Sequence, residues 1–233
     1  MKQALITGGA RGIGFGIAEA MLAAGYRVTV TGLTAEEVAV VPGRDNLEAV
    51  RLDVTSDPDV AACIARLPKL DALVNCAGMV LRDGKEFTIA GFQKVIDVNL
   101  TGTMRMCVGA RPLLEKQGGA IVNIASIWSF FGGPLVPAYT ASKGGVVQLT
   151  KSLAVAWAPA IRVNAIAPGW IETELTKAAQ QDTARSDAIV SRTPFGRWGQ
   201  PGDIGGAAVF LCSDAAGFIT GTILPVDGGY TAK

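Results

Sequence analysis

The chain has 233 residues, of which 49% are hydrophobic and 18% are charged, and its formal net charge is +1. This composition provides material for a substantial core and argues against long disordered segments. Lysine and arginine are scattered along the chain, which argues against a basic face for nucleic acid or for a membrane surface, and no apolar stretch reaches the roughly 18 residues of a membrane span.

Four cysteines and the lack of histidine limit the chemistry of the chain. The cysteines form no CxxC pair, so we expect reduced thiols in a cytoplasmic protein and no metal site. The first residues, MKQALITGG, lead directly into a motif and leave no room for a signal peptide. Without histidine, proton transfer near neutral pH requires a tuned tyrosine, lysine, cysteine or carboxylate.

Short apolar runs alternate with longer helical patterns along the whole chain. Seven runs are rich in Val, Ile, Leu and Ala, as expected for strands buried on both faces: 2–7, 26–31, 47–54, 70–75, 119–126, 161–168 and 222–227. Helices are predicted at 13–25, 57–66, 88–116, 139–158 and 201–212. This alternation predicts one doubly wound α/β domain of the Rossmann type, with a seven-stranded parallel sheet covered by helices on both faces.

The segment TGGARGIG (7–14) follows the first predicted strand and opens the first predicted helix. Gly8, Gly12 and Gly14 allow a tight turn and a close approach to a ligand, and the free N–H groups of the helix start face an anion. The spacing is G-x-x-x-G-x-G rather than the commoner G-x-G-x-x-G. Between a strand and a helix, this loop predicts a site for a dinucleotide diphosphate.

The end of the second predicted strand normally meets the adenosine ribose of a dinucleotide. An acidic residue there would accept hydrogen bonds from the 2′-hydroxyl and repel a 2′-phosphate. Gly32 and Leu33 stand at this place, and Arg11 is well placed to pair with a 2′-phosphate. NADP is therefore favoured, with NAD and a merely solvated Arg11 as alternatives. Asp53 ends the third predicted strand, where it would hold the adenine amino group or cap the following turn.

With its second half included, the chain resembles the classical short-chain dehydrogenase/reductase family over essentially its whole length. The motifs that carry this resemblance are TGGARGIG (7–14), LDV (52–54), NCAG (75–78), the Asn of DVNL (97–100), Ser126 after IVNIA, YTASK (139–143), PGWIET (168–173) and VDGGY (226–230). The resemblance implies one domain over 1–233, with a cofactor half at about 1–118 and a catalytic half at about 119–233. Residues 175–200, the most polar long stretch, would be a mobile substrate segment or an ordinary surface excursion.

The resemblance places the catalytic residues of the family at Asn99, Ser126, Tyr139 and Lys143. Tyr139 would pass the proton between carbonyl and alcohol, and Ser126 would hold the substrate oxygen as charge develops there. Lys143 lies one turn further along the same helix face. A role at neutral pH needs the pKa of the tyrosine lowered by about three units. Lys143 is expected to supply part of this lowering, with the oxidised nicotinamide adding to it, and to hold the nicotinamide ribose. Asn99 would hold a water that relays protons from Lys143 to solvent.

The resemblance also spreads the cofactor contacts over both halves of the chain. They are Gly8, Arg11, Gly12, Ile13, Gly14, Gly32, Leu33, Asp53, Val54, Asn75, Ala77, Gly78, Tyr139, Lys143, Pro168, Gly169, Ile171 and Thr173. The Ile171 backbone would hold the carboxamide and the Thr173 hydroxyl the carboxamide or the diphosphate, which together would determine the nicotinamide face that meets the substrate.

Aromatic residues lie close in sequence to the predicted catalytic residues. Trp128, Phe131 and Trp170 are expected to form an apolar wall opposite the nicotinamide, or else to pack in the core or in a subunit contact. The pattern is similar to that of 3-oxoacyl-(acyl carrier protein) reductases, so one expectation is a carrier-linked substrate that docks near Lys116 and Lys177.

The sequence thus predicts an oxidoreductase that transfers a hydride between NADP(H) and a carbonyl or secondary alcohol, with 3-oxoacyl reduction as one candidate. The alternatives are an NAD-dependent sugar or small-alcohol dehydrogenase and, less favoured, a non-catalytic nucleotide sensor on the same fold. The family also implies a homo-oligomer, a tetramer or a dimer, built from the helices at 88–116 and 139–158 and from the last strand.

Overall fold

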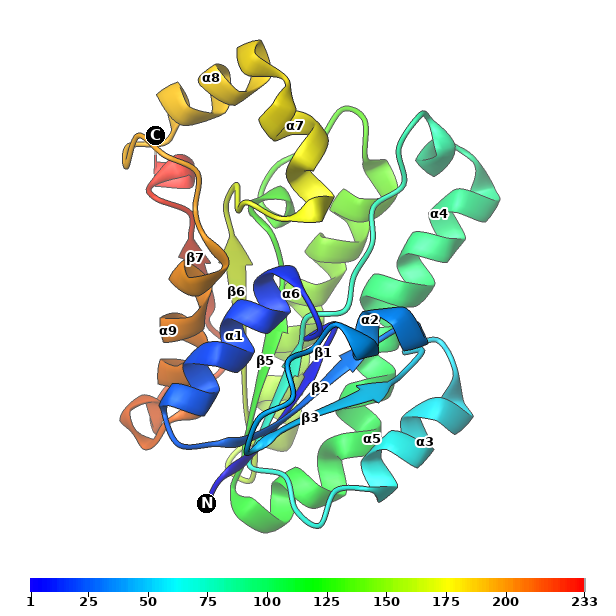
Figure 1. The fold of residues 1–233 in the computed structure, drawn as a ribbon, viewed down its shortest axis with the longest axis vertical. Helices are drawn as coiled ribbons and strands as arrows, with labels where there is room; N and C mark the ends of the chain where they lie inside the picture. The colour runs from blue at the N-terminus through cyan, green and yellow to red at the C-terminus, as the bar shows by residue number, and fades with distance from the viewer. Residues whose placement is uncertain (233) are drawn as a thin grey trace.

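A parallel sheet of seven strands forms the centre of the protein, whose computed structural model describes residues 1–232 (Figure 1). In sheet order, the strands are β3 (Leu47–Arg51), β2 (Arg27–Gly32), β1 (Gln3–Thr7), β4 (Ala72–Asn75), β5 (Ala120–Ile124), β6 (Arg162–Pro168) and β7 (Ile223–Val226). All neighbouring strands are parallel. The predicted fold class is confirmed.

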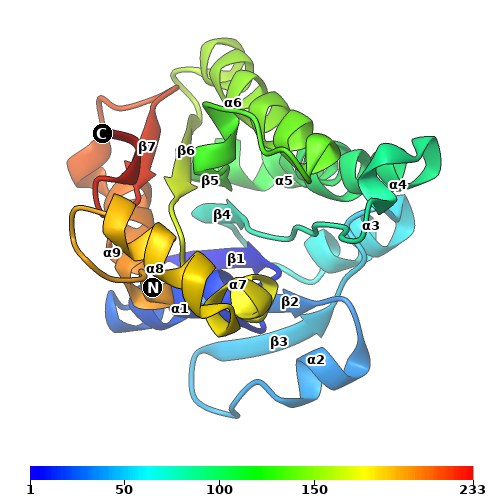
Figure 2. The ribbon, with the colours of Figure 1, turned by 90° about the horizontal axis from the view of Figure 1, so that it is seen from above.

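Helices cover both faces of this sheet. The helices along the chain are α1 (Gly12–Ala23), α2 (Ala35–Ala39), α3 (Asp57–Ala65), α4 (Ile89–Ile96), α5 (Gly102–Gln117), α6 (Pro137–Trp157), α7 (Lys177–Gln181), α8 (Thr183–Arg192) and α9 (Pro201–Cys212). The helices α1 and α9 pack on one face, whereas α3, α5 and α6 pack on the other. Figures 1 and 2 show α7 and α8 above the carboxyl ends of the strands. Within residues 1–232, no helix is long and apolar enough to cross a membrane.

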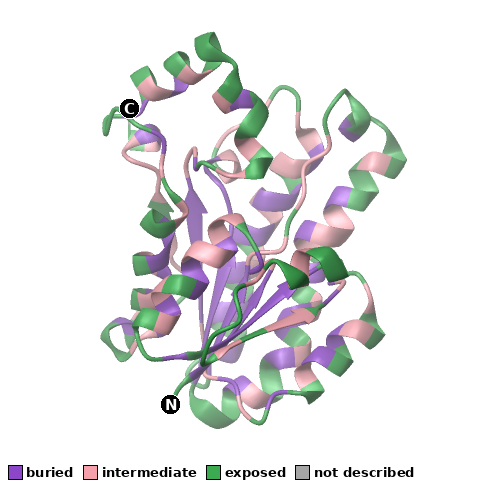
Figure 3. Ribbon diagram, in the orientation of Figure 1, coloured by how far each residue is buried: buried purple, intermediate pink, exposed green. Residues whose placement is uncertain are grey.

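Successive residues of a strand point into two different cores. In β1, Ala4 and Ile6 pack with α1 and α9, whereas Leu5 packs with α3 and α5. Because both faces are covered, both sets of side chains must be apolar. The apolar runs of the sequence therefore located the strands. The inner strands β1, β4, β5 and β6 are buried, whereas the edge strands β3 and β7 are partly exposed (Figure 3).

The structure differs from the predicted elements in four places. The predicted helix 88–116 is interrupted by a π-helical turn, Asp97–Thr101, which separates α4 from α5. The third strand ends at Arg51 rather than at residue 54. The polar stretch 175–200 contains two helices, α7 and α8, and the short helix α2 was not predicted. The mobility of residues 175–200 stays a prediction.

Candidate active site

A cavity of about 1080 Å³ lies at the carboxyl ends of the strands, where open parallel sheets bind their ligands. The glycine loop, the ends of β2, β5 and β6, and residues 173–176 line it. All the predicted cofactor residues except Asn75 belong to this lining, and so do Ser126, Trp128 and Trp170. Asn99 and Phe131 do not. The structure thus gathers most of the predicted site around one cavity.

The glycine loop lies directly against the segment that follows β4. Gly8 has a φ of +61°, and a Cβ there would lie 2.8 Å from the Cα atom of Ala77. A Cβ on Gly14 would lie 2.4 Å from the carbonyl oxygen of Gly8. No side chain caps the first N–H groups of α1. These groups face the cavity without a side-chain partner, so the loop fits the diphosphate of a dinucleotide.

An acidic side chain reaches the predicted ribose subsite, although neither Gly32 nor Leu33 is acidic. It comes from Glu37 in α2, whose carboxylate accepts a hydrogen bond from the Leu33 N–H (2.7 Å) and pairs with the Arg11 guanidinium (2.8 Å). Thr34 caps α2 by accepting from the Glu37 N–H. The sequence TAEE (34–37) carries the Thr-x-x-Glu pattern of such a helix start, a signal that could have revealed α2.

Two predicted cofactor residues make contacts that stabilise the protein itself. Asp53 follows β3 rather than ending it, and its carboxylate accepts from the backbone N–H and the hydroxyl of Thr55 (2.9 and 2.7 Å). It therefore caps the turn, as one of the two interpretations expected, while it also lines the cavity. The Asn75 amide donates to Asn123 (2.9 Å) inside the sheet and faces no ligand site.

The structure brings Ser126, Tyr139 and Lys143 together at one wall of the cavity. The Ser126 hydroxyl accepts from the backbone N–H of Trp128 (3.2 Å), and it lies close enough to the Tyr139 phenol to influence its pKa. The Lys143 Nζ lies 5.7 Å from the centre of the Tyr139 ring and donates to the Ile124 carbonyl (2.6 Å). The parallel strand β5 and the first turns of α6 place all three at the carboxyl edge of the sheet.

The electrostatics of this wall differ from the expectation. Burial raises the pKa of Tyr139 to about 12, against the opposing effect of the nearby Ser126 hydroxyl. Burial also lowers the pKa of Lys143 to about 8. The predicted lowering of the tyrosine pKa is thus wrong for the protein alone, because removal of water disfavours the phenolate. Tyr139 holds its proton here, whereas Lys143 changes charge near pH 8.

Replacement of Lys143 by methionine is expected to stabilise the protein at pH 7 by about 2 kcal/mol, after the loss of the bond to Ile124. The folded pKa lies below the unfolded value, so wild-type stability rises between about pH 8 and pH 10.5. The gain of the variant disappears over this range, and the variant becomes less stable than the wild type by about 1 kcal/mol, because it still lacks the bond to Ile124. Urea unfolding at pH 7 and at about pH 10.5 measures the difference in the free energy of unfolding between the variant and the wild type. Lys151→Met, at an exposed position of α6, serves as the control; equal gains in both variants would contradict the expectation.

Asn99 lies in the π-helical turn and is fully buried. Its amide nitrogen donates to the Met79 carbonyl (2.9 Å) and to the Ser142 hydroxyl (3.0 Å), and its amide oxygen accepts from the Met79 N–H (2.8 Å). The side chain thus ties the segment after β4 to α6. The predicted water relay stays a prediction, and this side chain has no amide N–H left for it.

Glu86 is a functional candidate that the sequence did not indicate. Its carboxylate is 1% exposed and accepts from the N–H groups of Leu81 and Tyr139, each at 2.9 Å. It therefore caps the first turn of α6 at the predicted catalytic tyrosine, and its charge contributes to the raised pKa of Tyr139. Since 53 residues separate Glu86 from Tyr139, no local motif announces this contact.

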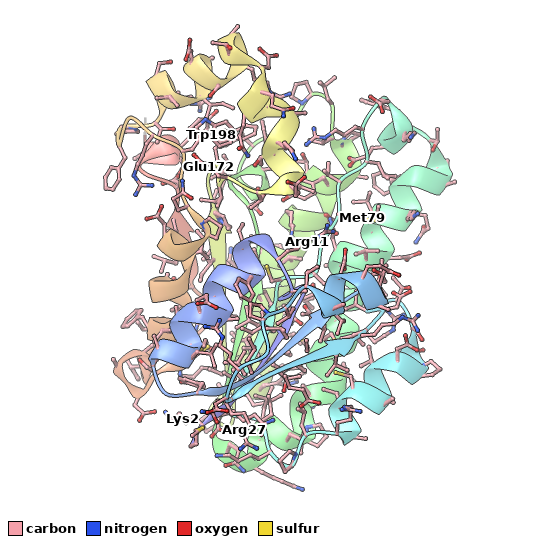
Figure 4. The ribbon with its side chains drawn as sticks, in the orientation of Figure 1. Lys2, Arg11, Arg27, Met79, Glu172 and Trp198 are labelled. Atoms are coloured by element: carbon pink, nitrogen blue, oxygen red, sulfur yellow. The ribbon has the colours of Figure 1, made fainter. Side chains whose placement is uncertain are left out.

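A series of edge-to-face aromatic contacts crosses the upper end of the cavity. The ring centres of Trp128 and Trp170 lie 6.1 Å apart, and those of Trp170 and Trp198 lie 5.7 Å apart. Trp198, labelled in Figure 4 near α8, donates to the Ser186 hydroxyl of that helix (2.9 Å). Phe131 packs behind Trp128 rather than on the cavity. Trp128 and Trp170 thus line the cavity and Phe131 does not, and their role as a wall opposite the nicotinamide stays a prediction.

The two lysines considered for an acidic carrier do not form one site. Lys177 is paired with Glu174 (3.1 Å) near the cavity. Lys116 belongs to the last turn of α5, just before β5 begins, and so lies at the opposite edge of the sheet.

Comparisons with known proteins agree with this site. A family model described as enoyl-(acyl carrier protein) reductase matches residues 8–231. The 2-dehydro-3-deoxy-D-gluconate 5-dehydrogenase of Bacillus subtilis is 43% identical, over 100% of this chain and 95% of its own. The D-threitol dehydrogenase of Mycolicibacterium smegmatis is 39% identical, over 100% and 94%. A gluconate 5-dehydrogenase from Burkholderia cenocepacia, solved with NADP and tartrate, has a TM-score of 0.93 and 36% identity, over 100% and 96%.

The chain therefore belongs to the short-chain dehydrogenase/reductase family and is an NAD(P)-dependent enzyme that acts on CH–OH groups. The expected similarity to 3-oxoacyl-(acyl carrier protein) reductases is only loose. The full-length relatives are named for sugar acids and a polyol, so they favour the alternative, a sugar dehydrogenase, and give no support to a carrier-linked substrate.

Proposed function

We propose that the protein is an NAD(P)(H)-dependent dehydrogenase that interconverts a secondary hydroxyl and a ketone of a sugar acid related to gluconate. The observation that carries this proposal is the single cavity that joins the glycine loop to Ser126, Tyr139 and Lys143. The full-length similarity to the dehydrogenase of Bacillus subtilis supports the sugar-acid substrate. The complex of the Burkholderia enzyme with NADP and tartrate, a hydroxy acid, supports both cofactor and substrate class.

In this proposal, NAD(P)(H) supplies or accepts the hydride. Tyr139, which retains its proton in the protein alone, donates it to the carbonyl oxygen during reduction. Ser126 holds that oxygen while negative charge develops on it. Lys143 holds the nicotinamide ribose and, in its charged form, favours the phenolate that oxidation of an alcohol requires. Gly12 and Thr173, which face each other closely across the cavity, hold the diphosphate.

We also place the enzyme in the cytoplasm, in keeping with four cysteines that are all free thiols in the structure. The homo-oligomer that the family implies is retained as part of the proposal.

A substrate panel tests the proposed function. Reduction of 5-keto-D-gluconate and 2-dehydro-3-deoxy-D-gluconate derivatives, and oxidation of the corresponding alcohols, are measured with NADP(H) and NAD(H). We expect the sugar acids to give the highest kcat/KM. The similarity to the D-threitol dehydrogenase makes oxidation of a neutral polyol the second candidate. A higher kcat/KM for D-threitol or for a 3-oxoacyl thioester would overturn the sugar-acid assignment.

A further inference from the structure

The rim of the cavity near α8 carries an arginine whose side chain has no protein partner. Arg82 and Arg185 both line this end of the cavity. The Arg82 guanidinium is held by the Leu175 carbonyl (2.7 Å), and the carboxylate of Glu174 is paired with Lys177. The Arg185 side chain makes no ion pair and no hydrogen bond with any part of residues 1–232. Its donors are therefore available to a ligand.

The surroundings of Arg185 orient it without neutralising it. The guanidinium lies over the Trp170 ring, with its central carbon 5.8 Å from the ring centre. Stacking on an aromatic face leaves the N–H groups at the edge of a guanidinium directed outward, in the geometry that binds a carboxylate. A planar anion thus finds a preoriented cation at this rim.

A second donor at the same place lacks an acceptor. The Nε1 atom of Trp170 is buried and has no hydrogen-bond partner among the described residues. An unsatisfied buried donor costs about 1–3 kcal/mol. A ligand oxygen would supply the missing acceptor once a shift of the Trp170 side chain exposes this N–H, which is buried in the structure.

This pair of donors lies close to the predicted reaction centre. Trp170 directly follows Pro168 and Gly169 at the end of β6, and it contacts Trp128. The backbone N–H of Trp128 donates to the Ser126 hydroxyl (3.2 Å). A substrate whose hydroxyl carbon meets Ser126 therefore extends along Trp128 and Trp170 toward Arg185.

We propose that Arg185 is a specificity-determining residue, which binds the carboxylate of the sugar acid together with the indole N–H of Trp170. The inference rests on the proposed function and names the residues of that site that distinguish an acid from a neutral polyol. Because Arg185 belongs to α8, binding of the carboxylate also joins this helix to the edge of the sheet.

Arg192 offers a matched control on the same helix. Its guanidinium stacks on the Tyr230 ring at 4.3 Å and lies near Phe131, but it does not line the cavity. Arg192 therefore represents an arginine that only stabilises α8 by stacking. Arg185 represents one that also binds substrate.

The test compares Arg185→Gln, Arg192→Gln and Trp170→Phe on a sugar acid and on its amide, which has a similar shape and no charge. Arg185→Gln is expected to lower kcat/KM for the acid by about 10- to 100-fold, mainly through KM, and to change that for the amide by less than about twofold. Trp170→Phe keeps the ring but removes the N–H, and it is expected to give a smaller loss on the acid. Arg192→Gln is expected to leave the ratio of acid to amide unchanged.

Equal losses on acid and amide, or the same change in Arg192→Gln, would show that Arg185 only stabilises α8 and would overturn the inference. Inhibition by tartrate separates this outcome from a failure of the proposed function. If the wild-type enzyme prefers neutral polyols, the proposed function fails. The inference still stands if tartrate inhibits the wild type competitively and about 10-fold less well after Arg185→Gln, and it fails if tartrate inhibits both equally.

Discussion

Replacement of Tyr139 by phenylalanine is expected to lower kcat for carbonyl reduction by about 100- to 10,000-fold, the range for loss of a positioned general acid. Burial raises the pKa of the Tyr139 phenol to about 12, so it is fully protonated at neutral pH. Phenylalanine retains the ring beneath Lys143 but cannot supply the proton. The Kd for NADPH, measured by fluorescence titration, is expected to change by less than about threefold, since the glycine loop is untouched.

The control for this experiment is Tyr26→Phe. The Tyr26 hydroxyl donates to the Cys212 carbonyl (3.3 Å), a contact between the residue before β2 and the end of α9, and neither residue lines the cavity. Its loss is expected to lower stability by about 1 kcal/mol and to leave kcat unchanged. Retention of wild-type turnover in Tyr139→Phe would refute the catalytic assignment and revive the alternative of a nucleotide sensor.

Glu37→Gln is expected to raise the preference for NADPH over NADH by about 10- to 100-fold. The carboxylate of Glu37 occupies the two donors that suit a 2′-phosphate, the Arg11 guanidinium and the Leu33 N–H. A 2′-phosphate must displace the carboxylate and meets its negative charge, whereas the 2′-hydroxyl of NAD donates a hydrogen bond to it. The change to glutamine removes the repulsion and weakens the hold on Arg11, so NADPH gains and NADH loses.

Glu36→Gln is the matched control, since Glu36 neighbours Glu37 in α2 but is exposed and does not line the cavity. The Kd values for NADPH and NADH, measured for both variants at the same ionic strength, give the preference without any knowledge of the substrate. Equal changes for the two cofactors in Glu37→Gln, or the same shift in Glu36→Gln, would show that Glu37 does not discriminate between them.

The sequence predicted the strands and most of the cavity because both depend on local patterns. Apolar runs identify strands that are buried on both faces, and the ends of parallel strands collect motifs such as NCAG and PGWIET at one edge. The contacts that it missed join residues far apart in the chain. Glu37 meets Arg11 from a helix of five residues, too short for a hydrophobic period to reveal.

The direction of the pKa of Tyr139 was also beyond the sequence. The four-residue spacing shows that Lys143 lies near the phenol, but it does not show how much water either group loses. In the structure, burial affects both groups more strongly than they affect each other, so the tyrosine pKa rises and the lysine pKa falls. The position of Asp53 depended likewise on where β3 ends, a boundary that apolar patterns locate only to within a few residues.

The carboxylate of Glu86 affects the local unfolding of the site. It accepts hydrogen bonds from both the Leu81 N–H and the Tyr139 N–H, so the loop after β4 and the start of α6 share one buried carboxylate. Separation of the two segments would leave that charge without one of its donors in a place with little water, which is costly. The loop and the helix that carries Tyr139 therefore form one cooperative unit, in which local unfolding of the loop also releases the proton donor.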